Sequence, residues 1–340
     1  MRRPEFRWWM VPAFGAGLAL GHAAVARMGG MNFEGKVVLI TGGSRGLGLV
    51  LAREFARRGA KVAVCARDEV ELTRARMDLR QHGAEVATFV CDVTDHEQVK
   101  STIEGTVQRF GRLDVLVNNA GVIQVGPLST MSEADFQEAM AINFWGPLHA
   151  SMEALPHLRK SHEGRIVNIS SIGGKLPVPH LLPYSASKFA LTGLSEGMRA
   201  ELLEDGIRVT TVCPGLMRTG SPRNATFKGE KAASEYQWFA VGDSLPLITM
   251  SAERAARKIV EACRRGQSEV VLTWSAKLAT WAHGLFPGLT SSMMAMVNSL
   301  LPHGHADGRY SFLGRATGAL NSHPLLTWLA DRAAVRNNEA

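Results

Sequence analysis

The amino-acid sequence predicts an α/β fold, a doubly wound parallel sheet with helices on both faces. Short apolar runs rich in β-branched residues alternate with longer segments of helical periodicity, and this alternation is typical of parallel sheets. A glycine-rich loop also stands between the first of these strands and the first helix. At 340 residues, the chain is long enough for one large domain of this class with extensions at its ends.

The first strand, loop and helix form one continuous unit. Residues 36–41 are apolar and β-branched, as in a buried parallel strand, and residues 49–58 carry apolar side chains on one helical side and arginines on the other. Glycines in the loop at residues 42–48 allow a tight turn and let backbone N–H groups approach a pyrophosphate. The unit therefore predicts a nucleotide-binding site, with a purely structural turn as the alternative.

The same alternation continues to about residue 273. Strands are expected at residues 61–65, 85–91, 114–118, 165–170, 207–213 and 269–273. Helices are expected at residues 69–81, 96–110, 132–158, 183–203 and 252–265. Ligands of such sheets bind at the carboxyl ends of the strands, where the strand order reverses, and the glycine loop and Ser170-Ser171 both follow strands.

A tyrosine and a lysine near residue 186 form a candidate acid–base pair. Tyr184 and Lys188 are separated by four positions at the start of a predicted helix, so both side chains should lie on one face. A positive charge within a few ångströms favours the phenolate and should lower the pKa of the tyrosine toward neutrality. This spacing also recurs by chance, so the rest of the sequence has to support the interpretation.

Composition excludes several other classes of site. The cysteines Cys65, Cys91, Cys213 and Cys263 show no C-x-x-C spacing, so we expect neither a disulfide framework nor a zinc site. His303 and His305 fall in a Gly/Pro loop without a cluster of carboxylates, and we expect no metal. The net charge is +7, but the basic residues are dispersed, so we expect no nucleic-acid partner.

Both ends of the chain depart from the alternating pattern. Residues 8–26 carry no formal charge and follow Arg2, Arg3 and Arg7. A membrane anchor is our main interpretation, an amphipathic or packed arm and a cleaved signal peptide being the alternatives. Residues 274–301 are apolar but interrupted at Pro287-Gly288, which predicts two short amphipathic helices that pack on the domain or contact a membrane.

Taken together, these motifs resemble the short-chain dehydrogenase/reductase family over roughly residues 33–271. The resemblance implies a Rossmann-type sheet, with a domain at residues 33–273. The hydrophobic segment at 1–32, interpreted as a membrane anchor, and the helical extension at 274–340 are read from the residues and lie outside the resemblance. The resemblance also implies the catalytic tetrad Asn143, Ser171, Tyr184 and Lys188. The implied cofactor-binding residues, besides Tyr184 and Lys188, are Thr41, Gly42, Ser44, Arg45, Gly46, Leu47, Gly48, Arg67, Asp92, Val93, Asn119, Ala120, Gly121, Pro214, Gly215 and Thr219.

The family likeness assigns a role to each tetrad residue. Tyr184 would exchange a proton with the substrate oxygen, and Lys188 would lower the pKa of Tyr184 and hold the ribose hydroxyls. Ser171 would hydrogen-bond the substrate oxygen, and is favoured over Ser170 because it stands thirteen residues before Tyr184. Asn143 would hold a water that links Lys188 to solvent. The alternatives are a strand-end cap for Ser171 and a polar helix residue bonded to backbone for Asn143.

The expected cofactor is NADP(H). Users of NAD place an acid at the end of the second strand, where this chain has Ala66 followed by Arg67. Arg67 and Arg45 suit a 2′-phosphate, the alternative being that both are merely solvated. Asp92 is expected to accept from the adenine amine, or else to cap its turn.

The expected activity is hydride transfer between the nicotinamide and a carbonyl or alcohol, with reduction as the favoured direction. The substrate should be lipophilic, of steroid, retinoid, long-chain acyl or sphingoid type, and His180 is the polar group expected to orient it. The apolar residues expected near it are Ile172, Leu176, Val178, Leu181, Leu182 and Leu216. We also expect a homo-oligomer, a dimer or tetramer, held at a membrane with its catalytic domain in the cytoplasm. The alternatives are a non-catalytic cofactor-binding redox sensor or membrane scaffold, and an epimerase or dehydratase on the same fold.

Overall fold

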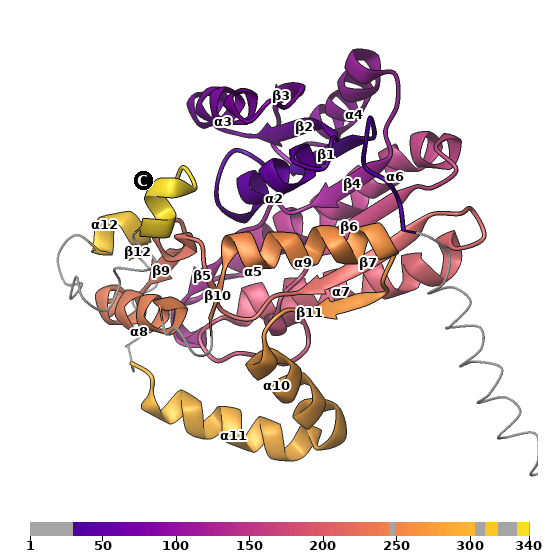
Figure 1. Cartoon of the computed structure of the whole chain (residues 1–340). Coiled ribbons are helices and arrows are strands. Elements are labelled where there is room, and N and C mark those ends of the chain that lie inside the picture. The colour runs from indigo at the N-terminus through magenta and orange to yellow at the C-terminus, as the bar shows by residue number, and fades with distance from the viewer. Residues whose placement is uncertain (1–29, 245–248, 303–309, 319–331, 340) are drawn as a thin grey trace, which may run out of the picture.

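The protein is described from a computed structural model that covers residues 30–244, 249–302, 310–318 and 332–339 (Figure 1). Its centre is a seven-stranded sheet in the order β11-β7-β6-β4-β1-β2-β3, and every neighbouring pair is parallel. The strands are β1 Val37–Thr41, β2 Lys61–Ala66, β3 Val86–Val90, β4 Val115–Asn118, β6 Arg165–Ile169, β7 Arg208–Cys213 and β11 Glu269–Val271. The predicted fold class, a Rossmann-type doubly wound sheet, is confirmed.

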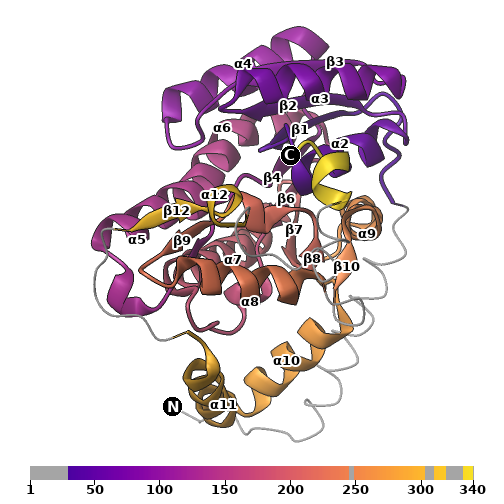
Figure 2. The same ribbon diagram turned by 90° about the vertical axis from the view of Figure 1, so that its left-hand side faces the viewer.

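Helices cover both faces of the sheet (Figures 1 and 2). One face packs against α2 (Gly46–Ala56), α3 (Glu69–Gln81) and α9 (Ala252–Arg265) in an apolar cluster around Leu51 and Phe55. The opposite face packs against α4 (His96–Phe110), α6 (Gly146–Lys160) and α7 (Leu182–Leu202). Because β1, β4 and β6 are fully buried between these layers, their nearly continuous apolar sequences are those of inner parallel strands.

Local signals fix where several of these helices begin and end. Asp68 and Asp95 accept hydrogen bonds from Glu71 N and Gln98 N, which caps the first turns of α3 and α4. Gly111 ends α4 in the left-handed conformation, with φ of 82°. These caps lie at the helix ends expected from the sequence, and they leave the carboxyl edge of the sheet free for a site.

The long helix expected at residues 132–158 is interrupted in the structure. It divides into α5 (Glu133–Met140), a π-helical turn at Ala141–Trp145 and α6. The π turn contains Asn143 and turns its side chain inward, where it is fully buried. Single π turns inside helices are frequent at functional sites, because they displace one side chain from the regular helical face.

A smaller subdomain, which the sequence analysis did not predict, stands beside the carboxyl edge of the sheet. It comprises β5 (Gln124–Val125), β9 (Thr226–Lys228) and β12 (Ser311–Leu313) as a second sheet, with α8 (Ala232–Ser244) packed against it. β8 (Met217–Arg218) and β10 (Met250–Ser251) pair separately. Phe227, Tyr236 and Phe239 form its apolar centre. The segment after residue 274 is therefore not wholly a separate extension, because β12 pairs with β9.

The expected pair of helices near the end of the chain is present as α10 (Trp274–Leu285) and α11 (Pro287–Leu300). The pair stands away from the central sheet, as both views show (Figures 1 and 2). None of the helices in the described ranges is both long and apolar enough to cross a membrane. The anchor expected at residues 8–26 lies outside the described residues.

Candidate active site

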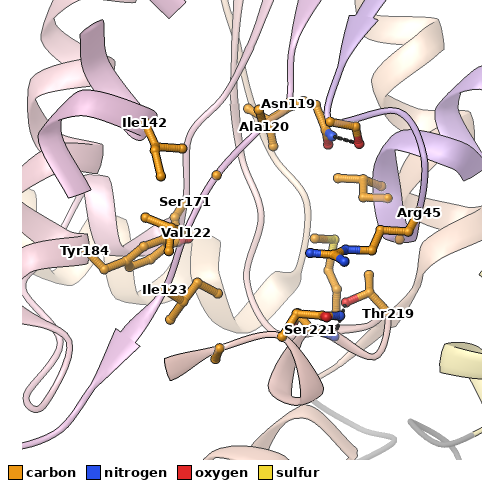
Figure 3. A pocket seen from close by; sticks show the side chains of 18 of the residues that line it. Arg45, Asn119, Ala120, Val122, Ile123, Ile142, Ser171, Tyr184, Thr219 and Ser221 are labelled. Atoms are coloured by element: carbon orange, nitrogen blue, oxygen red, sulfur yellow. Dashed lines mark hydrogen bonds between the residues drawn. The ribbon is translucent and has the colours of Figure 1, made fainter. Parts of the chain in front are cut away.

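A cavity of about 830 Å³ opens at the carboxyl ends of the central strands. Figure 3 shows its two ends, with Arg45 and Thr219 on one side and Tyr184 and Ser171 on the other. It runs from the glycine loop to the start of α7, across the point where the strand order reverses between β1 and β4. Ligands of open α/β sheets bind at such a reversal, so the position is that expected from the sequence.

Most of the predicted site residues line this cavity. They are Gly42, Ser44, Arg45, Gly46, Leu47, Arg67, Asp92, Val93, Asn119, Ala120, Gly121, Ser171, Tyr184, Lys188, Pro214, Gly215 and Thr219. Thr41, Gly48 and Asn143 are not in its wall. Gly48 shapes the loop, while Thr41 and Asn143 bond the backbone of residues that do line the cavity.

The glycine loop has the backbone that a phosphate site needs. Gly42 and Gly46 have φ of 62° and 55°, which other residues rarely adopt. A Cβ at Gly48 would collide with the carbonyl oxygen of Gly42. The loop can therefore curl tightly and lead directly into the N-terminus of α2, where backbone N–H groups and the helix dipole favour an anion. This backbone fits the pyrophosphate of a dinucleotide.

Thr41 and Asn119 clamp the loop to the end of β4. The hydroxyl of Thr41 accepts from the backbone N–H groups of Asn119 and Ala120, at 3.0 and 3.1 Å. The Asn119 amide in turn donates to the carbonyl oxygens of Thr41 and Gly42, each at 3.0 Å. Both side chains thus position the loop, and the Thr41 hydroxyl and the Asn119 NH2 group are already bonded within the protein.

Tyr184 and Lys188 lie on one face of α7, as their spacing predicted. The Lys188 ammonium stands 5.8 Å from the centroid of the Tyr184 ring and donates to the carbonyl of Ile169 at 2.9 Å. Asn143 lies behind them and bonds to Val122 N, to Val122 O and to the Ser187 hydroxyl, at 3.1, 3.2 and 2.9 Å. The amide of Asn143 is thus bonded to backbone, the alternative considered from the sequence.

Burial, rather than the ammonium, dominates the proton affinities of this pair. Loss of water raises the pKa of Tyr184 to about 12, while a hydrogen bond from Ser171 opposes that shift. The same loss of water lowers the pKa of Lys188 to about 8. The expected lowering of the tyrosine pKa by Lys188 is therefore wrong for this arrangement. The phenol stays protonated at neutral pH, a state suited to donating a proton.

The two adjacent serines have different environments. Ser170 is buried, and its hydroxyl bonds the carbonyl of Lys188 at 3.1 Å and the hydroxyl of Thr192 at 2.7 Å. Ser171 lines the cavity, hydrogen-bonds Tyr184 and also accepts from Gly173 N at 3.0 Å. Both serines line the cavity, but the Ser170 hydroxyl is bonded within the protein, so Ser171, which also caps its turn, is the one placed to bond a ligand beside Tyr184.

The opposite end of the cavity carries paired charges. Arg45 forms an ion pair with Glu71, whose other oxygen accepts from the Ser44 hydroxyl at 2.9 Å. Arg67 is exposed and stands 3.8 Å from Asp92. Asp92 also accepts from Thr94, through the backbone N–H at 2.9 Å and the hydroxyl at 2.8 Å. Glu71 was not predicted, since nothing in its position on α3 distinguishes it from the other charged residues of that helix.

Several wall residues come from the small subdomain and could not be placed from the sequence. Asp243 on α8 is buried in the wall, and burial raises its pKa to about 7. It accepts a hydrogen bond from the Ser221 hydroxyl at 3.2 Å. The apolar wall comprises Val122, Ile123, Ile142, Ile172, Val178, Leu181, Leu216, Trp238, Phe239 and Leu313.

Some predicted neighbours of the substrate lie elsewhere. His180 does not line the cavity but is buried against Glu235, with its Nδ1 2.9 Å from a carboxylate oxygen. The expectation that it orients the substrate is wrong for this arrangement, because its polar edge is turned to that carboxylate. Leu176 and Leu182 are also absent from the wall. Within the ranges that the structure describes, no group of His, Cys, Asp or Glu is arranged to hold a metal ion.

Comparisons with known proteins agree with this geometry. The family model for short chain dehydrogenases matches residues 36–228. A dehydrogenase/reductase SDR family protein 7-like of Anopheles gambiae is 34% identical over 265 residues, covering 76% of this chain and 81% of that one. An 11-beta-hydroxysteroid dehydrogenase A of Sesamum indicum is 37% identical over 242 residues. The match covers 70% of this chain and 68% of that protein.

A solved structure resembles the chain as well. It is a short chain dehydrogenase/reductase from Burkholderia phymatum, in complex with NAD, with a TM-score of 0.69 and 26% identity. The match covers 76% of this chain and 96% of that one. The likeness therefore extends over nearly the whole of that structure.

Gly48→Ala tests the glycine loop. The added Cβ should collide with the Gly42 carbonyl and displace the loop, at a cost of about 1–3 kcal/mol in the free energy of unfolding. Chemical denaturation measures this loss, and fluorescence titration with a reduced nicotinamide dinucleotide should show weakened binding. Gly193→Ala, on the exposed face of α7 with open space at its Cβ, is the control and should be neutral or slightly stabilising. Equal stability and binding in the two variants would contradict this account of the loop.

Proposed function

Because the chain belongs to the short-chain dehydrogenase/reductase family, we propose that it is an NADP(H)-dependent oxidoreductase acting on the carbonyl or alcohol of a lipophilic substrate. Its family membership rests on the match over residues 36–228, more than half of the chain. The observation that carries the proposal is the pair of partly buried Tyr184 and buried Lys188, with Ser171 beside the phenol, at one end of a cavity whose other end is the glycine loop.

Each residue at the Tyr184 end of the cavity has a separate role in the reaction. The protonated Tyr184 phenol donates to the substrate oxygen during reduction, and Ser171 hydrogen-bonds the same oxygen as negative charge develops there. When bound, the nicotinamide supplies or accepts the hydride. Lys188 holds the ribose hydroxyls with its ammonium, and Asn143 fixes the backbone at Val122, on the wall that faces Tyr184. A water held by Asn143 would link Lys188 to solvent.

The proposed preference for NADP(H) rests on the arginines at the other end. Arg45 and Arg67 both line the cavity, and Ala66 stands where a user of NAD carries an acid. Two guanidinium groups favour a 2′-phosphate dianion. Glu71 opposes this preference because it is already paired with Arg45, so the 2′-phosphate has to draw Arg45 away from that carboxylate.

The apolar wall favours a lipophilic substrate. Ile123, directly before β5, Trp238 and Phe239 of α8 and Leu313 of β12 all contribute to the apolar wall of the cavity. Two acidic residues, Glu138 of α5 and Asp243 of α8, interrupt the apolar lining. Burial raises the pKa of Asp243 to about 7, which allows it to be protonated and to act as a neutral hydrogen-bond donor. A relative named for its hydroxysteroid dehydrogenase activity supports the same substrate class.

We further propose that the protein docks on a membrane through α10 and α11, with its catalytic domain in the cytoplasm. Large apolar side chains are exposed along both helices: Trp274, Leu278, Trp281, Leu285, Phe286, Leu289, Met293, Met296 and Leu300. Residues 274–301 contain no acidic residue, so nothing in the segment repels an anionic lipid surface. Exposed tryptophans on such a face are typical of proteins that sit in the membrane interface.

Tyr184→Phe tests the chemistry. Removal of the proton donor should lower kcat by about 10²-fold or more, with a panel of apolar ketones and NADPH oxidation as the readout. Cofactor binding should persist, because the ring and Lys188 stay in place. Tyr310→Phe, a change at an exposed tyrosine outside the cavity, is the matched control and should leave activity unaltered. Full activity in Tyr184→Phe would contradict the role of Tyr184 as proton donor, whereas wild-type protein that binds cofactor but turns over no carbonyl would favour the cofactor-binding sensor or scaffold.

Arg67→Ala and Arg45→Ala test the choice of cofactor. Loss of one charge-assisted phosphate contact should lower kcat/KM for NADPH by an amount that corresponds to about 1.5–3 kcal/mol of lost interaction free energy. It should leave kcat/KM for NADH nearly unchanged. Arg74→Ala, at an exposed arginine of α3 outside the cavity, is the control. Glu71→Gln should shift the preference further toward NADPH. A wild-type protein that prefers NADH would overturn the assignment.

The membrane proposal is tested by flotation with vesicles of phosphatidylcholine and phosphatidylserine. The full chain should float with the vesicles, and the double variant Trp281→Glu/Leu289→Glu should bind at least severalfold more weakly without a change in Tm. Met77→Glu, at an exposed apolar residue on α3, is the control. Full-length protein that stays wholly with the soluble fraction would refute the proposal.

A further inference from the structure

Residues 332–339 lie against the glycine loop, although they are far from it in the sequence. Residues 332–336 form a helical turn, which both views show beside α2 (Figures 1 and 2). Ala334 is fully buried, and a Cβ at Gly220 would collide with it. Arg336 pairs with Glu253 on α9 at 2.8 Å, and Arg53 on α2 donates to the carbonyl of Arg336 at 3.1 Å. The segment is thus packed into the domain.

The end of this segment occupies hydrogen-bonding groups of the phosphate site itself. The backbone N–H of Gly46, the first residue of α2, donates to the carbonyl of Asn337 at 2.8 Å. The Asn338 amide donates to the carbonyl of Ser44 at 2.9 Å and to that of Glu71 at 3.2 Å. The N–H of Gly46 belongs to the group of donors that a pyrophosphate would use.

Glu339 places a carboxyl group in the same cavity. It lines the wall of the cavity, and a Cβ at either Gly46 or Gly220 would collide with one of its carboxyl oxygens. One of these oxygens is buried without a hydrogen-bond partner among the described residues. A buried acid with an unpartnered oxygen beside an anion-binding loop is costly to keep, so an anionic ligand would displace it readily.

We propose that residues 332–339 are an internal competitor for the pyrophosphate site, which a dinucleotide has to displace before it can bind. The inference rests on the proposed function, because it takes the glycine loop as the cofactor site. Displacement adds the free energy of the segment's contacts to the cost of binding, so the observed affinity for cofactor is lower than that of an open site. The docked segment would lower the fraction of enzyme with bound cofactor, and so its activity, when the cofactor concentration is low.

The competition should depend on pH through Glu339. Burial raises the pKa of Glu339 to about 8, against an ordinary value near 4.5 when the segment is free, and the charged groups facing it are Arg45, Glu71, Arg223 and Asp243. Protonation therefore favours the docked segment. Docking is strongest at low pH and weakens as the pH rises from about 4.5 to about 8. Cofactor should then bind more tightly across that range.

The test compares NADPH affinities of full-length proteins by fluorescence titration. The double variant Asn338→Ala/Glu339→Ala removes the two side-chain hydrogen bonds of Asn338 and the buried carboxyl, and its Kd should be about tenfold lower than that of the wild type at pH 6.5. Val335→Ala, at an exposed position of the same segment, is the matched control and should leave Kd unaltered. Equal melting temperatures establish that all variants are folded.

Glu339→Gln separates charge from packing. The neutral amide should hold the segment in place at every pH, so the ratio of its Kd to that of the wild type should rise between pH 6 and pH 8. The other groups that titrate there, such as Asp243, are common to both proteins. A ratio that does not change with pH would remove Glu339 from the competition.

Hydrogen–deuterium exchange observes the displacement directly. Addition of NADPH should increase exchange in peptides that cover residues 332–339 and decrease it in those that cover residues 42–48. If NADPH binds with the same Kd to all variants, or protects both segments together, the inference is overturned while the proposed function stands. If NADPH binds to none of the proteins, the proposed function fails and the inference fails with it.

Discussion

The clamp between Thr41 and Asn119 is the interaction on which the rest of the site depends. β1 and β4 are neighbours in the sheet, but their chains leave its carboxyl edge in different directions, which opens the cavity between them. Four hydrogen bonds across this gap, all of 3.0–3.1 Å, hold the glycine loop at a fixed distance from the end of β4. These bonds hold the start of α2 opposite α7, so they set the distance between the two ends of the cavity.

Burial is the second determinant, and it acts differently at the two ends of the cavity. At the α7 end it raises the pKa of the Tyr184 phenol to about 12 and lowers the pKa of Lys188 to about 8. Loss of water therefore sets the two pKa values more than the attraction between the two groups does. At the loop end, the site is already filled by groups of the protein: Glu71 holds Arg45, and Asn337 holds the N–H of Gly46. A ligand there has to exchange contacts, which links affinity to the state of residues 332–339.

The sequence was sufficient to predict the central sheet, the glycine loop and the Tyr184–Lys188 pair, because those features follow from local patterns. Strand, glycine loop and helix succeed each other within about twenty residues, and Tyr184 and Lys188 are one helical turn apart. The small subdomain was not predicted, because β5, β9 and β12 are two or three residues long and pair across distant parts of the chain. The roles of His180 and Glu71 depend on tertiary neighbours, as does the contact of residues 332–339, and a single sequence contains no local signal for any of these.

The most direct measurement of the central claim is the fate of deuterium carried at C4 of NADPH. In a single-turnover reaction with an apolar ketone, the account predicts that the deuterium transferred is found on the carbinol carbon of the product and that the deuterated cofactor reacts more slowly. The solvent should supply only the hydroxyl proton, through Tyr184. Deuterium released to water, or an oxidised cofactor without labelled alcohol, would contradict hydride transfer at this site.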